Sequence, residues 1–419
     1  MFSKYGFIRS KWRKFRRPSR DTKQKRRYDK MVDRIVNAHN LPGSERKLNT
    51  DIFDYYSWEE LGGRANVEAK TDSRPCYIWF VPDWLNVWGG GHYTLFRFAN
   101  HFAKKGTRQI IFVYNNQRHE SPDALLATLN SALENCQLEV IVDPSKLPRC
   151  DAAIATTWQS AYFVRSFPHA ASKFYFMQDF ESQFYAHGTQ SMQALNSYSF
   201  GFHGITGGGW NKMHFESFGG KAEAYIFATD RNLFFPVDQS GRTREAVKKI
   251  FFYGRPSTER RCFELGVASL ALIATKYPDI EIVMAGLDIG STMPFKVTML
   301  GNLTLAKTGE LYRTCDIGIA FSGTNLSYLP VELMACGVPV VSNRGDQVEW
   351  YCEHGVNALL VDPTPMSVLS AVDELVGNHD LRTLLASNGL KISRERTWES
   401  EMDRIYDYSV SCLAADQKR

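Results

Sequence analysis

Residues 324–341 read TNLSYLPVELMACGVPVV and contain the transition that decides the fold. A polar loop leads into a short helix with Glu332 in its first turn, the helix ends at Gly337, and an apolar strand follows. This order is typical of a parallel sheet whose strands are joined by helices. A carboxylate at the ligand edge of such a sheet can accept hydrogen bonds from two vicinal hydroxyls, as in a ribose. The alternative is that Glu332 only stabilises the positive end of the helix dipole.

Short apolar runs separated by amphipathic stretches recur along the chain from about residue 76. Strands buried on both faces of a parallel sheet have this pattern. The first series lies at residues 76–81, 109–114, 138–142, 152–156, 173–177, 201–206 and 222–228, and the second at residues 249–253, 280–285, 297–300, 316–321, 338–342 and 358–361. The sequence therefore predicts an α/β protein with two doubly wound, Rossmann-like parallel sheets, whose strand ends face each other across a ligand-binding cleft.

The two series are separated by a polar stretch in which Pro236 and Gly241 act as breakers, and we expect the hinge at residues 236–248. An apolar periodicity that begins at Trp398 suits a helix docked back on the first domain. The expected units are an N-terminal extension (1–70), an N-terminal domain (71–238), a C-terminal domain (239–397) and the docked helix (398–419).

Composition and cysteine spacing limit the class of protein. Of the 419 residues, 44% are apolar and 23% are charged, which is enough for two hydrophobic cores. No apolar run reaches the roughly 18 residues that a membrane-spanning helix needs. The eight cysteines form no C-x-x-C or Cys/His cluster, so that neither a disulfide framework nor a zinc site is indicated. We therefore expect a cytoplasmic protein.

The first 30 residues are strongly basic. They contain thirteen Lys or Arg and two Asp, a net charge of +11, so the rest of the chain carries −6. Apolar residues recur among them at steps of three and four, namely Phe2, Tyr5, Ile8, Trp12 and Phe15. This spacing predicts an amphipathic helix that lies on an anionic membrane surface, here the inner leaflet. A solvated basic tail and a tail that binds nucleic acid are the alternatives, and we expect no nucleic-acid partner.

Two glycine-rich turns each follow an apolar run. Residues 88–92 read WGGGH and precede a helical stretch from Tyr93 to Lys105. The backbone at Gly90 and Gly91 can approach a phosphate there, and the helix offers its first amides to it; a tight turn alone would also select glycine. Residues 206–210 read TGGGW, and for them a structural turn and a ligand contact are equally expected.

Arginines cluster where the second domain begins. Residues 252–261 read FYGRPSTERR, and Arg255 and Arg260 follow the end of a predicted strand. Their forked donors and fixed positive charge suit a diphosphate. Salt bridges to Glu259 or Glu264 are the alternative, and we regard the neighbouring Arg261 as a bystander.

Several of these segments resemble the glycosyltransferase family 4 group of GT-B enzymes. The resemblance covers residues 75–400 and implies a GT-B fold, with the donor held by the C-terminal domain and the acceptor by the N-terminal domain. It is carried by PVELMACGVPVV, FYGRPSTERR, VTMLGNLTLAKTGELYRTCDIGIAFS and AYIFATDRNLFFPVD. The segments GGGHYTLFRFANHFAKKG and YFMQDFES are most similar to the WsaF-type rhamnosyltransferases of bacterial surface-polysaccharide synthesis.

The resemblance assigns donor-binding roles to three residues. Arg255 and Arg260 match the family's Arg and Lys that hold the donor diphosphate, with Arg260 in place of the usual Lys. Glu332 matches the second glutamate of the family's pattern of two glutamates separated by seven residues, and it would contact the nucleotide ribose.

The sugar subsite departs from the family pattern at two positions. Thr324 stands in place of the first glutamate and, with the backbone amides of Asn325 and Leu326, would line the sugar subsite. Gln178 stands where many relatives have a histidine that touches the sugar. Both departures suit a deoxy sugar such as rhamnose, delivered as dTDP-rhamnose, and both are also compatible with impaired activity.

The resemblance implies a metal-independent, retaining transfer from a nucleotide-diphospho-sugar to a surface polysaccharide or lipid-linked glycan, with no cofactor. The two arginines and the amides of Gly90 and Gly91 would stabilise charge on the leaving diphosphate. In retention the leaving phosphate itself can take the acceptor proton; in inversion, Asp179 or Glu181 is the first candidate base.

Two other functions fit the sequence. A non-catalytic, membrane-docked subunit that binds sugar nucleotides or glycans would explain the missing first glutamate. A sugar-nucleotide epimerase with the GT-B fold would need acidic residues and a histidine around the sugar, and the Thr324 side of the subsite is poor in acids.

Overall fold

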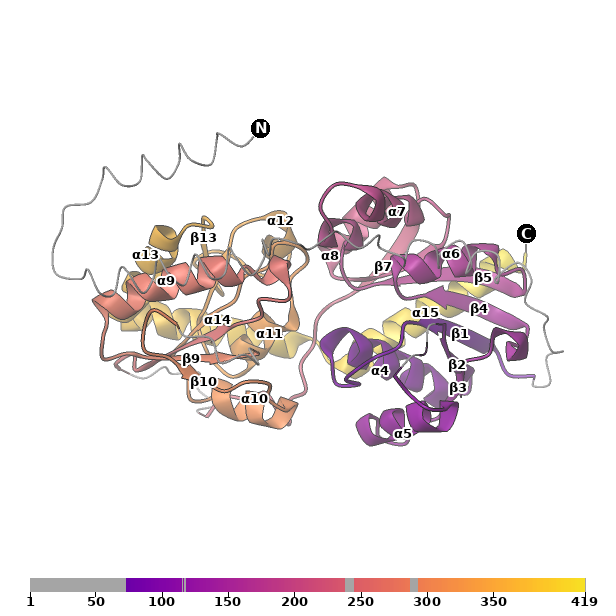
Figure 1. Cartoon of the computed structure of the whole chain (residues 1–419), viewed down its shortest axis with the longest axis horizontal. Helices are drawn as coiled ribbons and strands as arrows, with labels where there is room; N and C mark the ends of the chain where they lie inside the picture. Colours follow the sequence, from indigo (N-terminus) through magenta and orange to yellow (C-terminus); the bar gives the residue numbers. More distant parts are fainter. Residues whose placement is uncertain (1–72, 115, 117, 238–244, 287–292, 419) are drawn as a thin grey trace, which may run out of the picture.

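The computed structural model describes residues 73–114, 116, 118–237, 245–286 and 293–418. They form two α/β domains that lie side by side (Figure 1). The predicted basic extension at residues 1–70 and most of the predicted hinge lie outside these residues. The predicted fold class of two doubly wound parallel sheets is confirmed.

The described part of the N-terminal domain contains a parallel seven-stranded sheet with the order β3-β2-β1-β4-β5-β6-β7. Each apolar run of the first series overlaps one strand, which confirms the assignment. The strands are β1 (Cys76–Val81), β2 (Arg108–Val113), β3 (Leu138–Ile141), β4 (Cys150–Ala155), β5 (Ala170–Met177), β6 (His203–Gly207) and β7 (Lys221–Tyr225).

Helices cover both faces of this sheet because alternate strand residues point to opposite sides. In β1, Trp79 packs in a cluster with Phe98 of α4, whereas Phe80 packs in a second cluster with Phe163 of α6. The first face carries α4 (Gly90–Lys104) and α5 (Pro122–Ala132), and the second carries α6 (Trp158–Ser166), α7 (Thr189–Ser197) and α8 (Gly209–Ser217).

The described part of the C-terminal domain repeats this plan with a parallel six-stranded sheet in the order β10-β9-β8-β11-β12-β13. The second series of apolar runs is likewise confirmed. The strands are β8 (Lys249–Tyr253), β9 (Glu281–Ala285), β10 (Thr298–Met299), β11 (Ile317–Ile319), β12 (Val340–Asn343) and β13 (Leu359–Val361). The helices are α9 (Phe263–Lys276), α10 (Leu305–Tyr312), α11 (Tyr328–Ala335), α12 (Asp346–Glu349), α13 (Pro365–Gly377) and α14 (His379–Glu395).

Helix α11 begins earlier than the sequence pattern indicated. Ser327 is its N-cap and Pro330 lies in its first turn, where a missing N–H costs nothing. Glu332 therefore lies in the second turn, and the first turn contains no acidic residue. This position corrects our expectation and removes the helix dipole as the explanation for Glu332.

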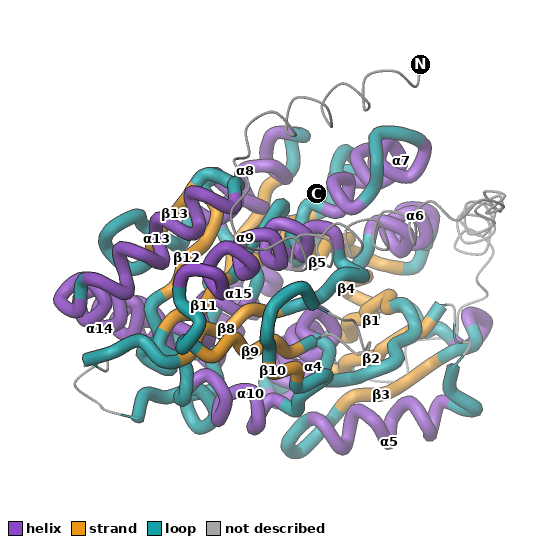
Figure 2. Tube along the Cα trace, turned by 60° about the vertical axis from the view of Figure 1, so that its left-hand side comes forward, coloured by secondary structure: helices purple, strands orange, loops and turns teal. Residues whose placement is uncertain are grey.

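The last helix, α15 (Trp398–Asp416), packs on the N-terminal domain against α4, β5 and β7. The yellow helix of Figure 1 crosses behind the strands of that domain, and Figure 2 shows the two sheets from another side. Ser409 lies 3.2 Å from the hydroxyl of Tyr77, and Asp416 pairs with His203 at 2.9 Å. The buried Glu401 accepts a hydrogen bond from the backbone N–H of Ile226 at 2.8 Å.

One hydrophobic cluster extends through both domains. It contains Trp79 and Phe98 of the first domain, Val331 of α11 and Trp398 of α15. The ring of Trp398 lies between those of Phe98 (6.3 Å) and Tyr328 (5.6 Å). Apolar side chains therefore join the two domains near the start of α15, in addition to the polar contacts between the domains.

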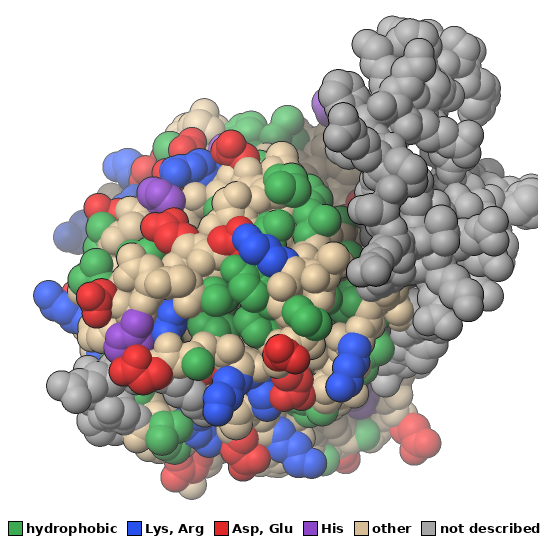
Figure 3. Space-filling model, turned by 90° about the vertical axis from the view of Figure 1, so that its left-hand side faces the viewer, with side chains coloured by type: hydrophobic (Ala, Val, Ile, Leu, Met, Phe, Trp, Pro, Cys, Tyr) green, Lys and Arg blue, Asp and Glu red, His purple; other side chains and the backbone are tan. Residues whose placement is uncertain are grey.

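Among the helices of the described residues, none is long and apolar enough to cross a membrane. On the face of the C-terminal domain in Figure 3, basic and acidic side chains are interspersed around apolar ones.

We expect the Glu401→Ala variant to lower the stability of the protein, because the partly buried N–H of Ile226 loses its acceptor and the guanidinium of Arg404 loses a carboxylate partner. The cost should be about 1–3 kcal/mol, or roughly 1–4 °C in the unfolding temperature of a chain of this length. Glu399→Ala, at an exposed position of the same helix, is the matched control. Calorimetric unfolding of both variants tests this expectation, and equal unfolding temperatures would contradict it.

Candidate functional site

The strand order reverses between β1 and β4 in the first sheet and between β8 and β11 in the second. Ligands of doubly wound sheets bind at such switch points, at the carboxyl ends of the strands. The glycine turn at residues 88–92 follows β1, and the arginine turn at residues 254–261 follows β8. Both sequence motifs therefore lie at the switch points of their domains.

Arg255 and Arg260 follow β8, and the charge of Arg255 lies close enough to act on Arg260. Arg255 is exposed, and its Nη1 lies 3.5 Å from the hydroxyl of Tyr253. Arg260 stacks on Phe184 of the other domain, with 3.9 Å from Cζ to the ring centroid. Burial lowers the pKa of Arg260, the charge of Arg255 lowers it further, and Asp179 opposes both effects. The buried Nε of Arg260 makes no hydrogen bond to any described residue.

Arg261 has a role that sequence reasoning missed. Its Nη1 donates a hydrogen bond to Ser322 Oγ at 2.8 Å and lies 3.4 Å from the backbone oxygen of Asn325. Burial lowers the pKa of Arg261 to about 10. The left-handed backbone of Cys262 (φ 52°) ends the short turn at Glu259–Arg261 and starts α9. Arg261 thus supports the loop after β11, and whether it stays a bystander of the diphosphate is a separate prediction.

The loop after β11 reaches across to the N-terminal domain. Thr324 Oγ1 donates to Asp179 Oδ2 at 2.8 Å, and the backbone N–H of Asn325 donates to Asp179 Oδ1 at 2.9 Å. The side-chain amide of Asn325 donates to the backbone oxygens of Gln178 (3.0 Å) and Gly207 (2.8 Å). The structure therefore brings Thr324 and Asn325 together with Gln178 and Asp179.

The two backbone amides that we expected to line a sugar subsite are both used inside the protein. The N–H of Asn325 bonds to Asp179, and the N–H of Leu326 bonds to the backbone oxygen of Gln347 at 3.0 Å. In this arrangement neither amide is available to a sugar, contrary to our expectation, because a carboxylate and a carbonyl oxygen already accept their hydrogen bonds.

Gly90 and Gly91 form the first turn of α4, which begins before the expected Tyr93. The N-cap is Gly89, which provides no side-chain cap, and the helical hydrogen bonds start with Tyr93 N–H to Gly89 O at 2.9 Å. The amides of Gly90 and Gly91 precede that bond and have no partner within the helix. Gln178 Nε2 donates to the backbone oxygen of Gly91 at 2.8 Å, so this side chain lies beside the start of α4.

The second glycine turn has a structural explanation. Gly208 has φ +83°, and a Cβ atom there would lie 2.5 Å from Cζ2 of Trp350 in the other domain. Trp350 also donates its indole N–H to Asn325 Oδ1 at 3.1 Å. Glycine at this position is therefore needed for close contact between the domains.

The two acidic residues after β5 have different environments. Both oxygens of Asp179 accept hydrogen bonds, from Phe180 N and Asn325 N at Oδ1 and from Thr324 at Oδ2. Burial raises its pKa, whereas Arg261 and Arg260 act in the opposite direction. Glu181 accepts a bond from Trp158 N at 2.7 Å, and burial raises its pKa to about 8.

Glu332 is partly buried near Asp230, which itself pairs with Arg97 at 2.7 Å. Burial raises the pKa of Glu332 to about 8, and the charge of Asp230 adds to this effect. No described residue donates a hydrogen bond to its carboxyl group. A buried carboxyl group without hydrogen-bond donors is stabilised when a ligand supplies two hydroxyl donors.

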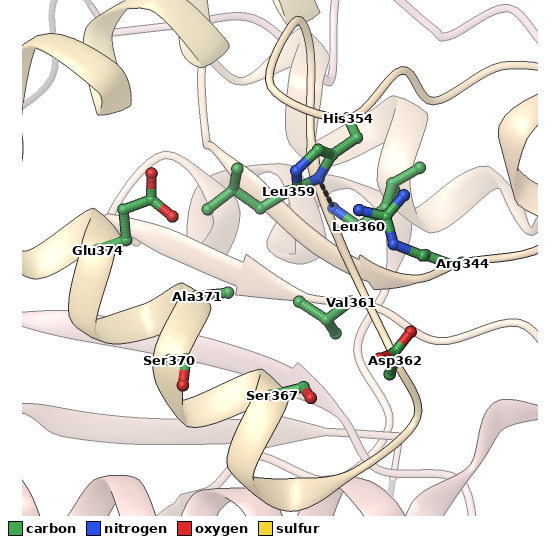
Figure 4. A pocket seen from close by; sticks show the side chains of 10 residues that line it. All are labelled: Arg344, His354, Leu359, Leu360, Val361, Asp362, Ser367, Ser370, Ala371 and Glu374. Atoms are coloured by element: carbon green, nitrogen blue, oxygen red, sulfur yellow. Dashed lines mark hydrogen bonds between the residues drawn. The ribbon is translucent and has the colours of Figure 1, made fainter.

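A pocket of about 290 Å³ lies away from these residues, between β13 and α13. Figure 4 shows Ser367, Ser370 and Glu374 on α13 opposite His354 and Arg344. His354 Nδ1 accepts a hydrogen bond from the backbone N–H of Leu360 at 3.0 Å. None of the predicted site residues lines this pocket. Within the described ranges, no three His, Cys, Asp or Glu side chains are placed to hold a metal ion.

Residues 248–373 match the family model described as WsaF, C-terminal domain. The O-antigen biosynthesis protein RfbC of Myxococcus xanthus is 38% identical over 356 residues, which are 82% of this chain and 27% of RfbC. A phosphatidyl-myo-inositol mannosyltransferase of Propionibacterium freudenreichii is 35% identical over 95 residues, 22% of this chain and 25% of that protein. The chain thus spans only 25–30% of the length of the curated relatives it matches.

Solved structures with the same arrangement include sucrose-phosphate synthase of Thermosynechococcus elongatus, with a TM-score of 0.63 and 13% identity over 82% of this chain and 100% of that one. Anabaena HepE in complex with UDP-glucose has a TM-score of 0.61 and 16% identity over 80% and 99% of the two chains. WaaG, a glycosyltransferase involved in lipopolysaccharide biosynthesis, has a TM-score of 0.57 and 10% identity over 80% of this chain and 99% of that one. At these identities the likeness establishes the fold alone.

The predicted resemblance is therefore confirmed: residues 248–373 match the model of the WsaF C-terminal domain, and the two described domains have the GT-B fold.

Proposed function

We propose that this protein is a glycosyltransferase that moves a sugar from a nucleotide-diphospho-sugar to a surface polysaccharide or a lipid-linked glycan. One observation carries the proposal: Arg255 and Arg260 follow β8 at the switch point, and Arg260 contacts Phe184 and Asp179 of the opposite domain. Fixed cations at this position suit a leaving diphosphate. The name of RfbC supports a role in surface-polysaccharide synthesis, the mannosyltransferase of P. freudenreichii supports the class of reaction, and the UDP-glucose complex of HepE supports the class of donor.

In the proposed reaction, the bond from the anomeric carbon to the phosphate oxygen breaks, and its electron pair stays on the diphosphate. The acceptor hydroxyl forms the new bond to the anomeric carbon. With retention of configuration, the departing phosphate takes the acceptor proton. Arg255, Arg260 and the amides of Gly90 and Gly91 would stabilise the negative charge that grows on the diphosphate.

For the sugar we propose a 6-deoxyhexose such as rhamnose, with dTDP-rhamnose as donor. Thr324 and Gln178 are neutral where the related pattern has a glutamate and a histidine, so the subsite offers fewer strong partners for hydroxyl groups. Glu332 would accept hydrogen bonds from the two ribose hydroxyls. The match of residues 248–373 to the WsaF model agrees with this choice.

A non-catalytic subunit that binds sugar nucleotides is the second candidate function. It is favoured by the internal hydrogen bonds of Asn325 N and Leu326 N, which leave those amides no free donor for a sugar. Incubation with nucleotide sugars separates the two functions: a transferase releases nucleotide only when an acceptor glycan is present, and a binding subunit releases none.

Arg255→Ala and Arg260→Ala should each lower kcat/KM roughly 100-fold, the effect of losing one donor to a developing anion. Arg149→Ala is the matched control. Arg149 is exposed and directly precedes β4, so it lies at the amino end of the strands of the N-terminal sheet, whereas the proposed site lies at the carboxyl ends. Donor affinity and acceptor-dependent turnover are measured for all three variants. Full turnover in both cleft variants would exclude a role for the arginines in transfer.

We also propose that residues 1–30, which lie outside the described part of the chain, bind an anionic membrane surface. Each basic residue near such a surface contributes about 1 kcal/mol. Deletion of residues 1–30 should abolish co-sedimentation with anionic vesicles and leave donor affinity unchanged; neutral vesicles serve as the control. Undiminished vesicle binding refutes the proposal, and retention on DNA without vesicle affinity favours a nucleic-acid partner.

A further inference from the structure

We propose that the carboxylate of Asp179 occupies, in the donor-free protein, the anion site that the donor diphosphate takes over. This inference rests on the proposed function, because it assumes that Arg260 belongs to the diphosphate site. Asp179 would then be an internal competitor of the donor and a positioning residue for the cleft, rather than a general base.

The partners of Asp179 are the first step. The residue follows β5 in the N-terminal domain, yet its carboxylate contacts Thr324 Oγ1 (2.8 Å), Asn325 N (2.9 Å) and Arg260 Nε (3.4 Å) of the other domain. All three belong to the connections that leave β8 and β11 at the switch point of the C-terminal sheet. The carboxylate of Asp179, from the N-terminal domain, is thus held by the loops after β8 and β11, and these are the loops that we propose to bind the donor.

The chemistry of these partners suits an anion. A guanidinium, a hydroxyl and a backbone amide are the donors that proteins use for carboxylates and phosphates alike. Arg261 adds a second buried positive charge, since it and Arg260 both lower the pKa of Asp179 against the effect of burial. Arg255 and Glu181 both act on Arg260 as well, and burial raises the pKa of Glu181 to about 8, so that its carboxyl group is largely uncharged at neutral pH. The positive charge left over is available to a ligand with more than one negative charge.

Asp179 and a diphosphate compete for the positive charge of Arg260. Two like charges about 4 Å apart repel each other by roughly 1–4 kcal/mol at the dielectric constants of water and a protein surface. A diphosphate oxygen that takes the place of Asp179 Oδ2 at Arg260 Nε therefore displaces the carboxylate, which breaks its bonds to Thr324 and Asn325. The bonds from the Asn325 side chain to Gln178 O and Gly207 O do not involve the carboxylate and can persist.

The same contacts argue against a general base. A base needs a lone pair that points to the acceptor hydroxyl. Oδ1 of Asp179 already accepts from Phe180 N and Asn325 N, and Oδ2 accepts from Thr324 with Arg260 beside it. The Nε of Arg260 lies close to the carboxylate without forming a hydrogen bond, so it gains a bond when a better-placed oxygen replaces Oδ2.

The test uses Asp179→Asn, which keeps the shape and an acceptor oxygen but removes the charge. Calorimetry at fixed ionic strength measures the affinity for inorganic pyrophosphate and for dTDP, UDP and GDP. The variant should bind these diphosphates about fivefold more tightly or better, the lower end of measured couplings between linked sites. A base or a sugar contact would leave this affinity unchanged, and a purely structural role would lower it.

Asp403→Asn is the matched control, because it removes the same charge from α15, where Asp403 pairs with Lys105 at 2.7 Å. Its diphosphate affinity should stay within about twofold of the wild type. Equal tightening in Asp403→Asn would show a general charge effect and overturn the inference, as would unchanged or weaker binding in Asp179→Asn.

A second variant decides the question if Asp179→Asn does not fold. Thr324→Val keeps the volume and the charge balance but removes one hydrogen bond that holds the carboxylate, so diphosphate affinity should also rise; unchanged or weaker binding overturns the inference. If the wild type binds no diphosphate, the proposed function fails and this inference with it. If the wild type binds diphosphates and Arg260→Ala does not, the proposed function stands. The diphosphate affinities of Asp179→Asn and Thr324→Val then decide whether the further inference is correct.

Discussion

The contact between Asp179 and the loop after β11 fixes how the two domains of this protein meet. A carboxylate from one domain is buried against a hydroxyl, an amide and a guanidinium from the other. Without those partners a buried carboxylate would be strongly unfavourable, so the contact selects one relative placement of the domains. In that placement Arg260 of the arginine turn lies beside Asp179, and the adjacent Gln178 donates a hydrogen bond to the start of α4.

Much of the fold could be predicted from the sequence because its strands are buried on both faces. Runs such as residues 76–81 and 250–253 are continuously apolar for that reason, and each one overlaps a strand. The element bounds were less certain where glycine and proline are tolerated in a first turn. Helix α4 begins at Gly90 and α11 begins before Pro330, which moved Glu332 into the second turn.

The candidate site was predictable as a set of residues but not as a set of contacts. The switch-point motifs placed Arg255, Arg260 and the first glycine turn correctly relative to their strands. The partners of Asp179 in the other domain are 81 to 146 positions away in sequence, and no local pattern encodes such a pairing. For the same reason the inward position of Arg261 and the contact of Gly208 with Trp350 became visible only in three dimensions.

Helix α15 follows the C-terminal domain in sequence but packs on the N-terminal domain. The polypeptide consequently passes between the domains at two places, once before β8 and once between α14 and α15. Arg231, which precedes the first crossing, donates hydrogen bonds to the backbone oxygens of Arg394 and Arg396 at the second crossing. The two covalent connections therefore lie next to each other at this point, and the contacts that the described residues make between the domains elsewhere are noncovalent.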